Sequence, residues 1–167
     1  MEHKTYTLND GREIHIRAFQ PEDKDQLNQF YGSLSEESLR WITPMTVDDM
    51  EHRINFPDYF IGLVTVHNGR IVGYGEIAKD PQRTDGELNI HIHQDYQGVG
   101  LGTAMMIMLV KEATDQHLHG VNLKVAASNM KAVHLFRKCG FQEILITKEL
   151  YSGEKHDTLH MRKVLNR

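Results

Sequence analysis

The chain lacks most features that mark secreted, membrane-spanning or nucleic-acid-binding proteins. It has one cysteine, Cys139, in 167 residues, so an internal disulfide is impossible and we expect a reducing, cytoplasmic setting. No apolar run approaches the ~18–20 residues of a membrane span, and the first residues lack the basic and apolar regions of a signal peptide. A net charge of −4 argues against a nucleic-acid-binding surface and is compatible with a basic partner.

Histidine is abundant, with eleven copies, but the copies are scattered. His91 and His93 alternate on one expected strand, and His117 and His119 flank the end of an expected helix. Neither pair has a carboxylate or thiolate at a recognised metal-ligand spacing. The sequence therefore predicts no metal site.

The pattern of apolar residues predicts one α+β domain that spans residues 1–167. Turn signals at Asp10-Gly11, Asn68-Gly69 and Ser152-Gly153 predict three hairpins. Helices are expected to begin at Pro21, to cover 35–42 with Trp41 inside, and to begin at Thr46. A long helix follows Gly102 and is expected to stop at Gly120, and another begins at Ser128-Asn129 and ends at Gly140. The order of elements predicts a mixed sheet with helices inserted.

A glycine-rich turn at 97–103 joins an alternating strand, 87–93, to the long helix. Free N–H groups and the positive dipole end at such a helix start suit a phosphate-bearing ligand. A nucleoside-triphosphate-binding loop requires a lysine after its last glycine, and no lysine follows Gly102. The spacing of Gly98, Gly100 and Gly102 also differs from that of a dinucleotide-binding motif. The alternative is a tight turn without a ligand.

Two motifs carry a family resemblance. Gln97-Gly98-Val99-Gly100-Leu101-Gly102 matches the Gln/Arg-x-x-Gly-x-Gly/Ala motif of the GNAT superfamily of N-acetyltransferases. Asn129-Met130-Lys131-Ala132, Leu135-Phe136 and Gly140-Phe141 resemble the segment that follows in that family, at matching spacing. The resemblance implies a mixed, mostly antiparallel sheet flanked by helices and splayed between residues 87–93 and 121–127.

A narrower resemblance concerns the acceptor. Segments 8–23 and 34–40, and a glutamate ten residues before Gln97, resemble the catalytic domain of Pat-type bacterial and archaeal protein lysine acetyltransferases. The resemblance implies acetyl transfer to a lysine side chain by direct attack in a ternary complex. A small amine or a protein N-terminus is an alternative acceptor, and a non-catalytic acyl-CoA sensor is an alternative function.

The superfamily resemblance also implies acetyl-CoA as the donor and assigns residues to it. Backbone N–H groups of the glycine turn would bind its pyrophosphate, and its pantetheine arm would pair with the open edge of residues 90–92. An N–H near Ile92 would stabilise the oxyanion, an effect worth ~3–4 kcal/mol. Asn129 would touch the arm; the alternative is a simple helix cap. The expected contacts are Ile90, His91, Ile92, Gln97, Gly98, Val99, Gly100, Leu101, Gly102, Thr103, Asn129 and Phe136.

The acceptor amine must lose a proton before it attacks, because an ammonium with a pKa near ~10.4 is inert at neutral pH. Glu87 is the first candidate base, since it matches the Pat-type glutamate. Glu76 is the second, since it interrupts a largely apolar strand. Each has a plain alternative as a solvated carboxylate on the sheet, and His91 and His93 could relay a proton instead.

Phe136 departs from the family pattern. Many relatives have at this position a tyrosine that protonates the leaving thiolate, and phenylalanine has no proton to donate. Either the thiolate leaves unprotonated, or water or another tyrosine supplies the proton. Cys139 lies one turn further along the same helix and is expected to pack in the core. The acceptor site is expected between segment 27–56 and the closing hairpin, and the sequence does not predict an oligomeric state.

Overall fold

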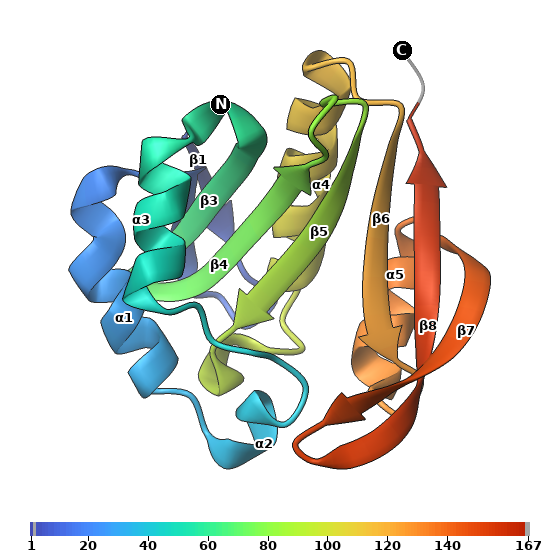
Figure 1. Ribbon diagram of the computed structural model, residues 1–167. Coiled ribbons are helices and arrows are strands. Elements are labelled where there is room, and N and C mark those ends of the chain that lie inside the picture. The colour runs from blue at the N-terminus through green and yellow to red at the C-terminus, as the bar shows by residue number, and fades with distance from the viewer. Residues whose placement is uncertain (2, 166–167) are drawn as a thin grey trace.

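The computed structural model describes residue 1 and residues 3–165. Strands and helices alternate irregularly along the chain (Figure 1). The strands are β1 (Lys4–Thr7), β2 (Glu13–Ala18), β3 (Phe60–His67), β4 (Arg70–Lys79), β5 (Asp85–Ile92), β6 (Gly120–Ala126), β7 (Gln142–Tyr151) and β8 (Glu154–Val164). The α-helices are α1 (Lys24–Gly32), α2 (Glu36–Leu39), α3 (Val47–Asn55), α4 (Leu101–Asp115) and α5 (Met130–Lys138), and the 3₁₀ turns are η1 (Pro21–Asp23), η2 (Pro57–Tyr59) and η3 (Gln94–Tyr96).

Among the described residues the strands form one eight-stranded sheet in the order β1-β2-β3-β4-β5-β6-β8-β7. Only the β5–β6 pair is parallel there. A parallel neighbour requires a crossover, which α4 supplies between the two strands. The expected mixed, mostly antiparallel sheet is therefore confirmed. No helix in the described part of the chain is both long and apolar enough to cross a membrane.

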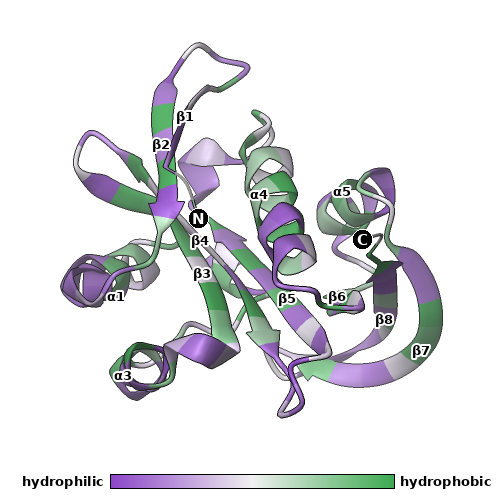
Figure 2. Ribbon diagram, turned by 90° about the horizontal axis from the view of Figure 1, so that it is seen from above, coloured by the Kyte–Doolittle hydropathy of each residue, from purple (hydrophilic) through white to green (hydrophobic). Residues whose placement is uncertain are grey.

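Helices cover both faces of the sheet (Figure 2). The apolar helix α4 and the amphipathic helix α5 lie on one face, and α1 and α3 lie on the other. Neighbouring side chains of a strand point to opposite faces; in β3, Leu63 packs in the α4 core and Val64 in the α1–α3 core. Both side chains are fully buried. The central strands are thus held from two sides.

The parallel strands β5 and β6 separate after a short contact. Their paired residues are Asp85 with Gly120, Gly86 with Val121, and Glu87 with Asn122. Beyond this point β5 stays paired with β4, and β6 stays paired with β8, so the sheet divides into two halves that diverge along the strands (Figure 1). The predicted splay is present, and it opens just after Glu87.

Two predicted helix limits are wrong. The expected helix 35–42 ends at Leu39, because Trp41 packs its ring against Tyr151 and His156 of the β7–β8 hairpin. The long helix ends at Asp115, well before Gly120, and His117 takes the left-handed conformation with φ 64°. Gly120 instead opens β6, where a Cβ atom would lie 2.3 Å from the Arg162 guanidinium. The three predicted hairpins are confirmed.

A partly buried hydrogen bond joins helix α1 to β5. Tyr31 Oη and His91 Nδ1 lie 2.8 Å apart, and the two rings meet edge to face. Burial lowers the pKa of His91 to about 4, although the charge of Glu76 nearby acts in the opposite direction. His91 is therefore neutral at physiological pH, and it forms part of the wall of β5 that faces the splay.

The neutral His91 should make the fold sensitive to acid. An unfolded histidine binds a proton near pH ~6.5, whereas the folded ring does so only near its pKa of about 4. Between these values the unfolded state binds more protons, so the free energy of unfolding falls as pH falls, on the order of 1–3 kcal/mol across the window. Urea unfolding at a series of pH values measures this dependence of the free energy of unfolding on pH.

His91→Asn should reduce the slope of the free energy of unfolding against pH. His117→Asn, at an exposed site, should retain the slope. Equal slopes in all three proteins would contradict a buried neutral His91.

Candidate active site

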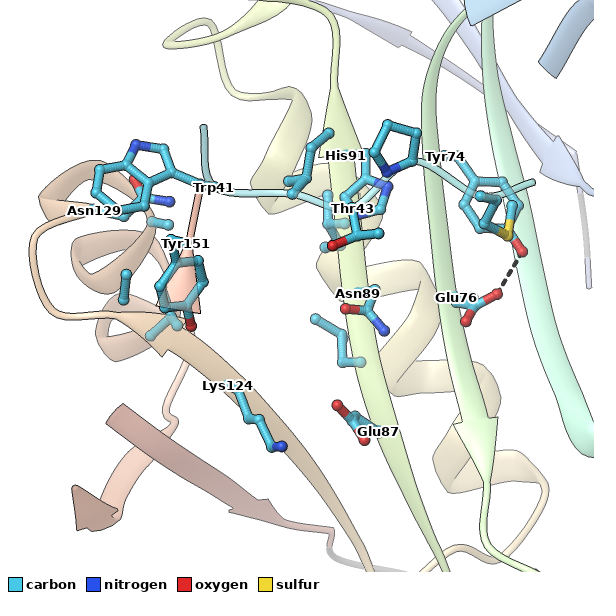
Figure 3. Close-up of a pocket in the computed structure, with 18 of the residues that line it drawn as sticks. Trp41, Thr43, Tyr74, Glu76, Glu87, Asn89, His91, Lys124, Asn129 and Tyr151 are labelled. Carbon is cyan, nitrogen blue, oxygen red and sulfur yellow. Dashed lines mark hydrogen bonds between the residues drawn. The ribbon is translucent and has the colours of Figure 1, made fainter. Parts of the chain in front are cut away.

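A cavity of about 390 Å³ opens where β5 and β6 diverge (Figure 3). One wall consists of β4 and β5, and the opposite wall consists of β6, the start of α5 and the end of β7. Segment 41–45, between α2 and α3, covers part of the opening. The cavity brings together six of the residues predicted from sequence: Glu76, Glu87, Ile90, His91, Asn129 and Phe136.

The remaining predicted contacts, outside the cavity lining, are Ile92 at the end of β5 and the residues of the glycine turn. Gly100 is the N-cap of α4 and has a left-handed φ of 94°, and no side chain caps this helix. A Cβ atom on Gly102 would lie 2.9 Å from Leu135 of α5. Glycine is required at the first position by backbone conformation and at the second by the close approach of the two helices.

The turn is held firmly to the rest of the protein. Gln97 Nε2 donates to the Ile92 carbonyl at the end of β5 (2.9 Å), and the Asn9 N–H donates to the Val99 carbonyl (3.0 Å). The first N–H groups of α4 have no carbonyl acceptor within the helix. A rigid turn with free N–H donors, next to the mouth of the splay, can bind an anionic group such as a phosphate.

Glu76 is a buried, fully engaged carboxylate. Only 3% of the residue is exposed. Arg53 of α3 donates to both carboxylate oxygens at 3.0 Å, and Tyr74 Oη donates to Oε1 at 2.7 Å (Figure 3). The alternative of a solvated carboxylate is therefore wrong for Glu76. The ion pair compensates a buried charge and fastens α3 to the sheet.

Glu87 differs from Glu76 in its exposure to solvent and in its hydrogen-bond partners. It is exposed at the last position of β5 that pairs with β6, and its side chain lines the cavity. Within the described residues no hydrogen bond or ion pair engages its carboxylate. Figure 3 shows Glu87 and Lys124 on facing strands, across the gap from one another. Lys124 lies instead 3.4 Å from Glu149. Glu87 thus presents a carboxylate without a hydrogen-bond partner among the described residues, where β5 and β6 begin to diverge.

Asn129 and Phe136 come from α5. Asn129 occupies the N-cap position, as the alternative expects, but its side chain makes no capping hydrogen bond. Phe136 is buried and lines the cavity, with its ring edge to face against Phe141. Cys139 packs against the α4 core, and burial raises the pKa of its thiol. The prediction that Cys139 belongs to the core is confirmed.

The sequence analysis missed two aromatic residues of the site, Trp41 and Tyr151. The Trp41 ring centroid lies 5.9 Å from that of Tyr151 and 5.2 Å from that of His156. Ser152 Oγ also donates to the Arg40 carbonyl (3.3 Å). We call these three rings the aromatic bridge, since they join the α2–α3 segment to the β7–β8 hairpin over the cavity. No motif marks them, because their contact is made only in the folded chain.

Comparison with known proteins agrees with this geometry. The model of the acetyltransferase (GNAT) family matches residues 17–141. A candidate [ribosomal protein bS18]-alanine N-acetyltransferase of Bacillus subtilis is 28% identical over 154 residues, which cover 90% of this chain and 95% of that protein.

Two solved structures share the fold. A GNAT-family acetyltransferase of Streptococcus pneumoniae is 27% identical, with a TM-score of 0.82 over 92% of this chain and 99% of that one. The GNAT domain of Streptomyces lividans PAT is 17% identical, with a TM-score of 0.79 over 98% and 97%. At that identity the second likeness shows the fold alone. This chain belongs to the GNAT family and is an acetyl-CoA-dependent N-acetyltransferase.

Proposed function

We propose that this enzyme transfers the acetyl group of acetyl-CoA to the side-chain amine of a lysine in a protein. The observation that carries the proposal is an approach lined by apolar side chains that ends at a free carboxylate. Trp41, Ile42, Pro44 and Met45 line the cavity together with Glu87, and Figure 3 shows Trp41 and Glu87 at different ends of it. A lysine side chain has the matching form, an apolar stem with a terminal amine.

The charges of the cavity support a lysine over a free amino acid. Its two nearest cations already face carboxylates, Arg53 with Glu76 and Lys124 with Glu149. An acceptor with its own carboxylate would find no uncommitted cation among these residues. An acceptor with an amine on an apolar stem needs no such cation, and the carboxylate of Glu87 attracts its ammonium group. The acidic side chains near the opening, such as Asp49, suit a lysine in a basic surface.

Glu87 is the general base of the proposed reaction. It accepts a proton from the lysine ammonium, directly or through one water, and the neutral amine attacks the thioester carbonyl in a ternary complex. Glu76 is unsuited to this role, because Arg53 and Tyr74 occupy its oxygens. Glu76 acts instead on the position of α3 and of the segment before it.

The glycine turn and the splayed edges hold the donor in this proposal. N–H groups between Gly98 and Thr103 bind the pyrophosphate. The pantetheine arm lies between β5 and β6, where it pairs with backbone groups near Ile90 and Ile92 as an added strand would. Asn129, whose amide makes no cap, contacts the arm, and Phe136 packs against it.

A protein N-terminus is the second candidate acceptor. It is favoured by the Bacillus subtilis relative, which matches over nearly its whole length and whose name specifies an alanine of a ribosomal protein as the acceptor. An α-amine would meet the same base, but it lacks the apolar stem that fits the approach.

A panel of acceptors tests the proposal. We expect the fastest acetyl-CoA-dependent thiol release with a lysine peptide whose N-terminus is blocked, and slower release with an alanine-led peptide that lacks lysine. Mass spectrometry identifies the modified amine. Faster turnover of the alanine-led peptide would establish the second candidate, and faster turnover of spermidine or a free amino acid would reject both.

Glu87→Gln should lower kcat by ~10²–10⁴-fold, because the amide accepts no proton, and should leave acetyl-CoA affinity nearly unchanged. The matched variant Glu76→Gln should keep most of its turnover and lose stability instead, since it leaves the buried Arg53 facing an uncharged amide. Steady-state kinetics and urea unfolding of both proteins separate the two roles. Near-normal turnover in Glu87→Gln, with a large loss in Glu76→Gln, would reverse the assignment.

Gly100→Ala should weaken acetyl-CoA binding about tenfold or more, since alanine in a left-handed conformation costs ~1–2 kcal/mol and distorts the turn. Gly69→Ala is the control. Gly69 has a similar φ of 75° and open space around it, but it lies in the β3–β4 hairpin. Calorimetric titration should show normal affinity for this control. Normal affinity in Gly100→Ala would contradict a phosphate site at the turn.

A further inference from the structure

Acetyl transfer leaves a thiolate, and the departure of that thiolate is easier when a nearby acid protonates it. Phe136, which lines the cavity from α5, has no proton to give. The question is which proton donor of the cavity replaces it. The candidates among the lining residues are His91, Lys124, Tyr74 and Tyr151.

Three of these donors are committed elsewhere. Tyr74 is buried and donates its hydroxyl proton to Glu76. His91 is neutral, since its pKa is about 4, and its Nδ1 is bonded to Tyr31. Lys124 lies at the narrow end of the splay with Glu87 and pairs with Glu149. Of the four candidates only the phenol of Tyr151 remains, and it lines the same cavity as Phe136 and Asn129.

We propose that Tyr151 protonates the leaving CoA thiolate, as a catalytic acid that enters the site from β7 instead of α5. Figure 3 shows Tyr151 beside Asn129, on the β6 side of the splay. Phe136, Asn129 and Tyr151 line the same cavity. The three residues come from separate elements, so a phenol from the closing hairpin takes the place left by the phenylalanine.

The surroundings of Tyr151 suit a proton donor. Thr158 Oγ1 donates to the phenol oxygen (3.1 Å), which leaves the phenol's own proton available to another acceptor. Thr158 is fully buried and lies on β8, opposite Ala126 of β6. The aromatic bridge fixes the ring, since Trp41 and His156 meet it edge to face at 5.9 and 6.0 Å. The hydroxyl bond also stabilises the phenolate that forms.

The step balances as follows. Once Glu87 has passed the proton of the ammonium to solvent, the neutral amine nitrogen forms a bond to the thioester carbonyl carbon, and the surplus proton of that nitrogen goes to Glu87. The carbon–sulfur bond breaks, the sulfur keeps the electron pair, and the Tyr151 proton passes to it. Solvent then returns a proton to the phenolate. The proposal requires only that the enzyme transfers an acetyl group, which follows from its membership of the GNAT family. It does not depend on lysine as the acceptor.

Tyr151→Phe should lower kcat by ~10²-fold with little change in the KM for either substrate. The double variant Phe136→Tyr/Tyr151→Phe, which moves the phenol to α5, should regain most of this loss. Tyr59→Phe makes the same change at an exposed tyrosine outside the cavity and should behave as wild type. An unchanged kcat in Tyr151→Phe would overturn the proposal. A rise in acceptor KM alone would also overturn it, since it would show that Tyr151 only shapes the acceptor approach.

A binding measurement needs no acceptor. A phenol that donates to sulfur favours the thiolate form of bound CoA, whose free thiol ionises near pH ~8.5. The ultraviolet absorbance of the thiolate at that pH should therefore be lower in the Tyr151→Phe complex than in the wild-type complex. Equal absorbance in the two complexes would overturn the proposal, even if no acceptor in the panel is turned over.

Discussion

The active site depends on hydrogen bonds that two neighbouring strands do not make. After the Glu87–Asn122 pair, β5 and β6 part, and each remains held by its other neighbour. Unpaired backbone groups are costly when buried and favourable when a ligand satisfies them. A sheet that stays intact on both sides of the splay can therefore keep one edge open for an extended substrate.

A different set of contacts holds each face of the sheet. On one face, the helix that follows the glycine turn packs into the α4 core through Leu101, Met105 and Leu109. On the other face, the Glu76–Arg53 ion pair and the Tyr31–His91 bond attach α3 and α1 to β4 and β5. These contacts hold the segment that carries Trp41 over the opening. Two separate cores on opposite faces of the sheet thus fix the strands that line the splay.

The two candidate carboxylates show how burial separates chemical roles. Glu76 and Glu87 are both glutamates on adjacent central strands, and the sequence offers either as a base. Burial requires Glu76 to have a compensating cation, and this commits its oxygens. Glu87 lies at the exposed end of the β5–β6 contact and remains free to exchange protons.

The sequence by itself determined the family, the hairpins and the glycine turn, because these depend on neighbours in the chain: alternating side chains, turn residues and a motif of fixed spacing. It did not determine the end of the helix before Trp41, the partner of Glu76, or the place of Tyr151 in the lining of the cavity. Each depends on residues far apart in sequence, such as Trp41 with Tyr151 and Arg53 with Glu76. Local pattern carries no information on such pairs, and only the tertiary packing of the chain brought them together.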